Sequence, residues 1–181
     1  LGINENRTTL LFFGIIRDYK GLDNLIQAMQ LLPDNFQLVI AGEVYGDVRK
    51  YTELIAASGK SESIYFFNQY IADEEVHRFF SVADLCVLPY RTATQSGVTA
   101  IAHFFNIPVL ATNVGGLKET IQHLVTGYII EHSDPKEIAA GIINYFHTHD
   151  FKKTQDALNQ LNKERSWENF ARQLLAFSSK I

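Results

Sequence analysis

The sequence has a single cysteine, Cys86, and therefore lacks a second thiol with which it could form an internal disulfide. A lone cysteine is typical of a protein kept in a reducing compartment. Cys86 lies in the apolar run Leu85–Leu88, and no candidate base lies near it in the sequence. We therefore interpret it as a buried structural residue rather than a nucleophile.

The sequence also lacks an excess of basic residues. Its 16 Lys and Arg face 20 Asp and Glu, which gives a net charge of -4 and an isoelectric point near 5.8. A protein that grips a nucleic-acid backbone needs a clustered excess of positive charge. The composition therefore predicts no nucleic-acid partner, although it leaves room for a local basic pocket that holds one small diphosphate.

No apolar stretch approaches the roughly 20 residues that a membrane-spanning helix needs, and no signal peptide is visible. We expect a cytoplasmic protein and leave open a contact of the full-length protein with the inner face of the membrane. The chain begins with Leu1 rather than Met, and a polar opening leads straight into an apolar run. We interpret residues 1–9 as a linker at the start of a fragment.

Several catalytic and metal-binding patterns are missing as well. The sequence contains no H-E-x-x-H, no G-x-S-x-G, no Walker loop and no G-x-G-x-x-G fingerprint. None of the six histidines pairs with a carboxylate at a spacing typical of metal ligands, so we predict no metal site. These histidines are His77, His103, His123, His132, His147 and His149.

Short apolar runs alternate with amphipathic stripes along the chain, which predicts alternating strands and helices. The expected strands are 10–16, 36–41, 63–67, 85–88, 108–111 and 127–130. The expected helices are 21–32, 47–58, 74–83, 96–105, 117–123, one that opens at Asp134, and a helical tail over 151–181 with Ser166 as a cap. Right-handed crossovers make this an α/β fold with a doubly wound, six-stranded parallel sheet, Rossmann-like, over residues 10–150. Such sheets bind ligands at the carboxyl ends of their strands.

The loop after the first strand is the first candidate site. Arg17 and Lys20 lie three residues apart between Gly14 and Gly21, just before a helix. Arg offers a planar fork to phosphate oxygens, Lys offers a mobile point charge, and Gly21 lets the backbone approach a ligand. The alternative is that both cations are solvated surface charges.

The segment after the fourth strand is the second candidate. Thr94, Gln95, Ser96, Gly97 and Val98 lead into an almost wholly apolar helix. The N-terminus of that helix directs free N–H groups toward the carboxyl edge of the sheet, where they can hold an anion. The alternative is ordinary capping by Thr94 or Ser96, which requires no ligand.

Two further segments follow strands three and five. Tyr70 and Ile71 could contact a nucleobase. Gly116 permits close backbone approach, and Glu119 could accept hydroxyl protons from a sugar or, alternatively, only complement the helix dipole. All four candidate segments fall on one edge of one sheet, which favours a site for a phosphate-bearing ligand.

Motifs over about residues 10–146 resemble the group 1 glycosyltransferases of the two-domain GT-B fold. The strand-one loop with Lys20-Gly21-Leu22-Asp23 is similar to the donor-diphosphate loop of that family. The run 83–89 resembles its hallmark strand, and 107–112 followed by Gly115-Gly116 and Glu119 resembles the segment after it. The resemblance implies that this chain is the C-terminal half of a GT-B enzyme.

The same resemblance implies a UDP- or GDP-sugar as donor, no cofactor and no metal. Arg17 and Lys20 would neutralise the departing diphosphate, the helix near Ser96 would add backbone donors, and Tyr70 and Ile71 would contact the base. The family retains the anomeric configuration, and its acceptor site belongs to an N-terminal domain that is absent here. We therefore expect this fragment alone to be inactive.

The sequence departs from the family pattern at two places. Ile15 replaces an arginine that often follows the strand-one glycine, and Arg17 is the expected substitute. Two glutamates that many members carry eight positions apart are missing around residues 94–102; the variant resembles a bacterial branch of the family, and Glu119 is a candidate replacement. The missing glutamates keep two alternatives open: a non-catalytic glycosyltransferase-like subunit and a GT-B sugar-nucleotide epimerase.

Overall fold

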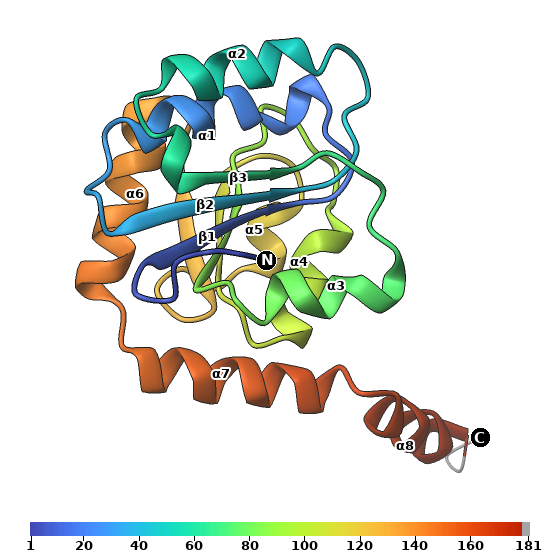
Figure 1. Cartoon of the computed structure of the whole chain (residues 1–181). Coiled ribbons are helices and arrows are strands. Elements are labelled where there is room, and N and C mark those ends of the chain that lie inside the picture. Colours follow the sequence, from blue (N-terminus) through green and yellow to red (C-terminus); the bar gives the residue numbers. More distant parts are fainter. Residues whose placement is uncertain (179–181) are drawn as a thin grey trace.

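The strands form one parallel sheet, as the alternation of apolar runs predicts (Figure 1). The computed structural model describes residues 1–178. The strands within this range are β1 (Thr8–Phe13), β2 (Phe36–Ala41), β3 (Ile64–Phe67), β4 (Leu85–Leu88), β5 (Val109–Thr112) and β6 (Gly127–Ile130). Their order across the sheet is β3-β2-β1-β4-β5-β6. This is the doubly wound, Rossmann-like α/β architecture.

Helices cover both faces of the sheet (Figure 1). The helices of the described residues are α1 (Leu22–Met29), α2 (Arg49–Ala57), α3 (Asp73–Phe80), α4 (Gly97–Phe104), α5 (Leu117–Thr120), α6 (Pro135–Thr148), α7 (Phe151–Glu164) and α8 (Trp167–Ser178). Apolar residues of α1, α2 and α6 pack in one core cluster. Those of α3, α4 and α5 pack in the other cluster, on the opposite face.

Strand β1 shows why the apolar runs are continuous rather than alternating. Leu10 and Phe12 point into the α1–α2–α6 core, whereas Leu11 and Phe13 point into the core beneath α3 and α4. All four are almost fully buried. A strand covered on both faces has no polar side, so its sequence reads as one apolar block.

The strand order changes direction between β1 and β4. The chain moves from β1 outward to β2 and β3, and then returns to β4 on the other side of β1. The loops that leave β1 and β4 therefore diverge to opposite faces at the carboxyl edge of the sheet. A crevice at such a switch point is where open α/β sheets bind their ligands.

Several predicted boundaries were wrong. The first strand ends at Phe13 rather than at residue 16, because Gly14 takes a φ of 92° and breaks the extended run. Helix α1 stops at Met29, and α5 is a single turn that ends at Thr120 instead of reaching residue 123. Asp73 is the first residue of α3, not its cap. At α6 the predicted cap is confirmed: Asp134 accepts hydrogen bonds from the N–H groups of residues 136 and 137.

The two ends of the chain also differ from the sequence expectations. Residues 8 and 9 belong to β1 rather than to a linker. The backbone of Asn4 forms two hydrogen bonds with the Gln37 side chain of β2: its N–H donates to Oε1, and its carbonyl oxygen accepts from Nε2. The helical tail is broken at 165–166 into α7 and α8. Ser166 accepts the Asn169 N–H at 3.2 Å, as an N-cap does; the predicted tail residues 179–181 lie outside the described residues.

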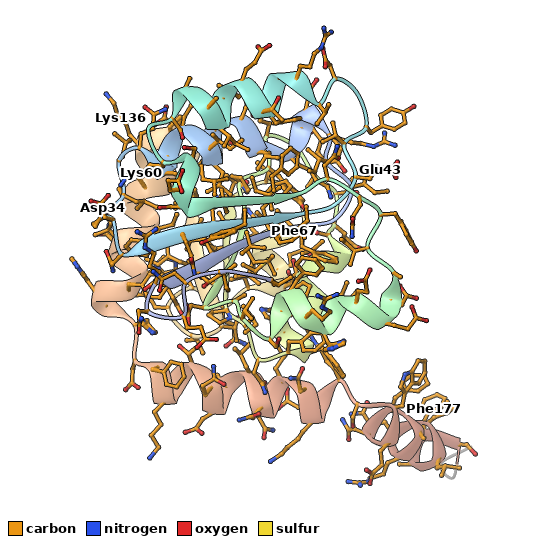
Figure 2. The ribbon with its side chains drawn as sticks, in the orientation of Figure 1. Asp34, Glu43, Lys60, Phe67, Lys136 and Phe177 are labelled. Atoms are coloured by element: carbon orange, nitrogen blue, oxygen red, sulfur yellow. The ribbon has the colours of Figure 1, made fainter. Side chains whose placement is uncertain are left out.

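Helix α7 runs beneath the body and contacts α4, and α8 projects away from it (Figure 1). Phe177 marks the projecting end in Figure 2. Over residues 1–178, none of the helices combines the length and apolar character that a membrane crossing requires.

Candidate functional site

The candidate site begins where β1 ends. Gly14 donates its N–H to the carbonyl of Ala41 at 2.9 Å and then turns the chain away from the sheet. Arg17 precedes a short 3-10 turn, η1 (Asp18–Lys20). Gly21 follows in the left-handed conformation with a φ of 68° and passes the chain directly into α1. The turn therefore places two cations between the sheet and a helix N-terminus.

Lys20 is the least expected side chain of this loop, because it is only 8% exposed. Its Nζ lies 5.6 Å from the ring centroid of Tyr90. Burial, and then the nearby charge of Arg17, lowers the pKa of Lys20 below its ordinary value. The ammonium forms no hydrogen bond or ion pair with any residue that the structure describes. A largely buried charge without a partner is costly, so the position is suited to a neighbouring anion.

Arg17 lies on the exposed side of the same loop. Its guanidinium carbon stands 4.3 Å above the ring of Tyr45, which belongs to the loop after β2. Stacking of this kind orients the planar fork while leaving its N–H groups available. Sequence reasoning missed Tyr45; the signal was an aromatic residue between two glycines, Gly42 and Gly46, at the carboxyl end of a strand.

The N-terminus of α4 forms the other side of the site. Ser96 stands at the N-cap position with extended dihedral angles, but its side chain accepts no capping hydrogen bond within the described chain. The N–H groups of Gly97 and Val98 likewise have no acceptor among residues 1–178. The Ser96 hydroxyl instead lies 3.4 Å from the Tyr90 hydroxyl. The capping alternative for Ser96 is therefore wrong, and the helix end is bare.

Gly14 lies between the Lys20 loop and the N-terminus of α4. A Cβ added to Gly14 would stand 3.4 Å from the Lys20 Nζ and 3.6 Å from a methyl group of Val98. The cation and the first turn of α4 thus flank the same point at the end of β1. The sequence expectation that these segments converge on one edge agrees with this arrangement.

Three other glycines near the site contact protein backbone instead of leaving space for a ligand, whereas a Cβ on Gly97 would meet no atom within 4 Å. A Cβ on Gly21 would lie 2.1 Å from the Pro89 carbonyl oxygen, and one on Gly115 would lie 1.7 Å from the Ala93 carbonyl oxygen. At Gly116 the conflict is with the Thr94 carbonyl oxygen, at 2.7 Å. These glycines admit neighbouring protein backbone rather than a ligand.

The remaining predicted residues surround this centre unevenly. Tyr70 is 70% exposed, whereas Ile71 is buried in the core beneath α3, so only Tyr70 presents its side chain at the surface. Thr94 and Gln95 are exposed in the loop before α4, and Glu119 is exposed on α5.

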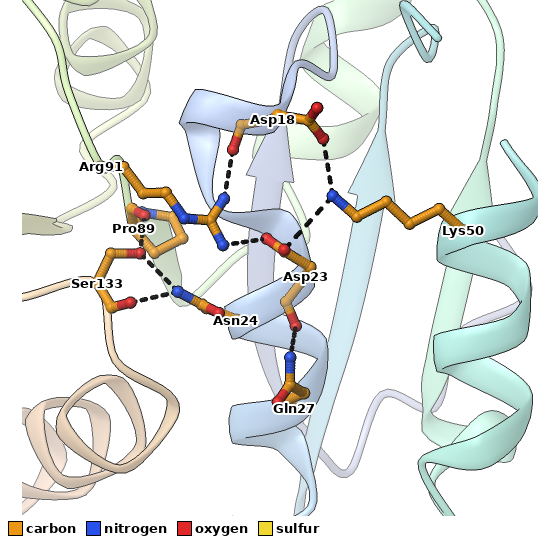
Figure 3. Close-up of polar contacts among 8 residues, drawn as sticks. All are labelled: Asp18, Asp23, Asn24, Gln27, Lys50, Pro89, Arg91 and Ser133. Carbon is orange, nitrogen blue, oxygen red and sulfur yellow. Dashed lines mark hydrogen bonds and ion pairs between the residues drawn. The ribbon is translucent and has the colours of Figure 1, made fainter. Parts of the chain in front are cut away.

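A network that the sequence did not reveal ties the loops together (Figure 3). Arg91, just after β4, donates one guanidinium N–H to the Asp18 carbonyl oxygen and another to Asp23 Oδ1 at 2.8 Å. Lys50 of α2 pairs with Asp18 at 2.7 Å and with Asp23 at 3.5 Å. The Ser133 hydroxyl donates to the Pro89 carbonyl oxygen at 2.5 Å. No sequence pattern singles out these partners, because they come from distant segments.

No group of three or more His, Cys, Asp or Glu side chains in the described range is arranged to hold a metal ion. What the site offers is cationic and dipolar: one buried ammonium, one stacked guanidinium and one bare helix end. Groups of this kind bind and neutralise oxyanions.

Known proteins that resemble this chain identify its family and its fold. The family model for glycosyl transferases group 1 matches residues 1–165. A glycosyltransferase of Methanocaldococcus jannaschii is 29% identical over 179 residues, which cover 96% of this chain and 45% of that protein. The lipopolysaccharide 1,2-N-acetylglucosaminetransferase of Salmonella typhimurium is 30% identical over 139 residues, covering 71% of this chain and 36% of that protein. The chain thus spans less than half the length of these relatives.

Solved structures share the fold. The sucrose-phosphate synthase of Thermosynechococcus elongatus superimposes with a TM-score of 0.81 at 22% identity, covering 98% of this chain and 46% of the other. The C-terminal domain of a group 1 glycosyltransferase, LpcC of Francisella tularensis, gives 0.75 at 21% identity, covering 87% and 85%. Anabaena HepE in complex with UDP gives 0.82 at 19% identity, covering 97% and 50%. The chain belongs to the group 1 glycosyltransferase family and has the fold of the C-terminal half of its GT-B members.

Proposed function

We propose that this chain is the donor-binding part of a retaining glycosyltransferase, which transfers a sugar from a UDP- or GDP-sugar to an acceptor hydroxyl. One observation carries the proposal: the ammonium of Lys20 is almost buried at the switch point of the sheet, beside a bare helix end, without a carboxylate in the described chain. The diphosphate of the donor is the anion that fits between them.

The chemistry of the reaction explains why this arrangement is useful. When an acceptor hydroxyl attacks the anomeric carbon, the bond from that carbon to the diphosphate oxygen breaks and negative charge grows on the leaving group. Lys20, Arg17 and the N–H groups of Gly97 and Val98 would stabilise that charge without a metal ion or another cofactor. Prearranged donors of this kind are typically worth about 10²–10³ in kcat each.

UDP is the first nucleotide to test. Anabaena HepE has been solved in complex with UDP and with UDP-glucose, and this chain shares the fold of that protein. In this proposal Tyr70 stacks against the base, and Thr94 and Gln95 face the donor. Glu119 contacts the sugar or ribose in place of the glutamates that many members carry.

Transfer requires more than this chain. The acceptor hydroxyl must be held in line with the anomeric carbon, and a closed cleft supplies much of the rate by orientation and exclusion of water. We assign acceptor binding to an N-terminal domain that precedes this one. The chain by itself should therefore bind the donor nucleotide without transferring its sugar.

Titration calorimetry with UDP, GDP and the corresponding sugar nucleotides tests donor binding. Lys20→Met removes the charge and keeps an unbranched side chain, so we expect it to weaken UDP or GDP binding at least tenfold, about 1.4 kcal/mol. Lys152→Met, at an exposed position of α7, is the matched control and should leave binding unchanged. Well-folded protein that binds none of these nucleotides would refute the proposal.

A further inference from the structure

Arg91 reaches across the candidate site from the segment that leads into α4 to the loop that carries Lys20. Three contacts join the two segments: the Arg91 N–H donates to the Tyr19 carbonyl oxygen at 2.7 Å, and the guanidinium donates to the Asp18 carbonyl oxygen and to Asp23. Figure 3 shows the two guanidinium contacts. Both backbone carbonyls lie within two residues of Lys20.

We propose that Arg91 is a positioning residue, which holds the Lys20 turn in register with the bare N-terminus of α4 so that both meet the same diphosphate. This inference rests on the proposed function for the identity of the ligand. The contacts from Arg91 to Asp18, Tyr19 and Asp23, which we call the Arg91 clamp, can be measured in the protein without a ligand.

Arg91 differs from Lys20, a cation assigned to the diphosphate, because Arg91 has a carboxylate partner within the protein. Arg91 Nη2 lies 2.8 Å from the Asp23 carboxylate, whose side chain is only 17% exposed. The second oxygen of Asp23 faces Lys50 at 3.5 Å. Arg91 is therefore already neutralised by the protein, whereas Lys20 has no such partner among residues 1–178. We therefore assign Arg91 the role of holding the Lys20 turn in place rather than of binding the diphosphate.

Other contacts hold the same loop: Lys50 pairs with Asp18 at 2.7 Å, and the Arg91 backbone N–H donates to the Tyr19 carbonyl oxygen at 2.7 Å. The η1 turn contains only three residues, and its internal bonds are Lys20 N–H to the Arg17 carbonyl at 2.9 Å and Gly21 N–H to the Asp18 carbonyl at 3.2 Å. Gly21 packs on the Pro89 carbonyl oxygen without a side chain between them. Among the described residues, the two guanidinium bonds are the side-chain hydrogen bonds that join this loop to the segment leading into α4, so their loss should loosen the turn relative to α4.

Arg91→Gln tests the clamp, with Arg91→Lys as the conservative variant and Arg78→Gln as the control. Arg78 is exposed on α3 and forms a single ion pair with Glu75 at 3.0 Å. Hydrogen exchange of the Lys20 and Gly21 amides is the ligand-free measurement. We expect exchange to accelerate at least tenfold in Arg91→Gln, less in Arg91→Lys and not at all in Arg78→Gln. Unchanged exchange in Arg91→Gln would overturn the inference.

Comparison of UDP with uridine separates positioning from a general loss of structure. If Arg91 positions the diphosphate groups, Arg91→Gln weakens UDP binding about five- to tenfold and leaves uridine binding unchanged. An equal loss for both ligands overturns the inference, because it shows a general disturbance of the fold. If the unmodified protein binds neither UDP nor GDP, the proposed function fails, and the exchange measurement alone decides whether Arg91 holds the turn.

Discussion

Lys20 is the side chain from which the proposed donor site makes its sharpest prediction. Its ammonium lies beside Gly14 and 5.6 Å from the centroid of the Tyr90 ring, and burial lowers its pKa. No carboxylate in the described chain offsets the charge. A lysine buried only for structural reasons would be expected to have such a partner. The proposed function explains this arrangement, because a bound diphosphate would supply the missing negative charge.

This arrangement predicts opposite effects on stability and on affinity. In the absence of nucleotide, Lys20→Met should raise the free energy of unfolding by on the order of 1 kcal/mol, because it replaces an unpaired buried charge with an apolar group. Urea unfolding at pH 7, with Lys152→Met as the control, measures this change. A clear loss of stability in Lys20→Met would mean that the ammonium has a structural partner within the protein.

At the level of elements, α4 links the candidate site to the tail. Its first turn faces the site, whereas its last turn packs on α7: Asn162 donates to the His103 carbonyl oxygen at 2.7 Å. The His103 side chain is 1% exposed, and neither ring nitrogen finds a hydrogen-bond partner among the described residues. Burial, and then the charge of Arg165, lowers the pKa of His103 to about 4.

His103 should make the stability depend on pH. Because its folded-state pKa lies below the ordinary value near 6.5, the unfolded chain takes up a proton first as the pH falls. The free energy of unfolding should therefore decrease between about pH 6.5 and pH 4, with His103 contributing on the order of 2 kcal/mol of that loss. Denaturant unfolding at pH 7.5 and pH 4.5 measures it.

Two variants isolate the contribution of this histidine from that of the acidic residues. His103→Leu cannot titrate and should lose most of the difference between the two pH values. His77→Leu, at an exposed position of α3, should keep it. Equal pH dependence in His103→Leu and the unmodified protein would show that His103 is not a buried neutral group.

The sequence predicted which helices and strands form, but several of their ends were wrong. It predicted the edge of the sheet where the candidate site lies, but not the ion pairs that join the loops there. Continuous apolar runs identify strands buried on both faces, which is why the sheet was predictable. Element ends depend on local dihedral angles, such as that of Gly14 at the end of β1. Arg91, Asp23 and Lys50 could not be paired from the sequence, because their contacts exist only after three distant segments have come together.

At the scale of the whole molecule, the layered body has a packed apolar core, whereas α8 lies outside it. Residues of α8 contribute nothing to either core cluster within the described chain. Its large apolar side chains are exposed, and Trp167 at 85% is the extreme case. The family match ends at residue 165, just before this helix. The layered body is therefore complete without α8.

Removal of residues 166–181 should accordingly leave the fold intact. We expect the free energy of unfolding to change by less than about 1 kcal/mol, since none of the α8 residues that the structure describes is buried. Self-association should decrease because an exposed apolar patch is removed. Urea unfolding and sedimentation velocity measure the two effects. A larger loss of stability would show that α8 packs against the body in solution.

The contacts at Gly21 and Gly115 have a consequence for how relatives of this protein should be interpreted. Backbone carbonyl oxygens occupy the space that a side chain would need at both positions, so we expect relatives with this fold to have glycine there whether or not they bind a nucleotide. Persistence of these glycines among relatives therefore measures architecture alone. If the proposed function is correct, the presence of a lysine at position 20 distinguishes relatives that bind a donor from relatives that keep only the fold.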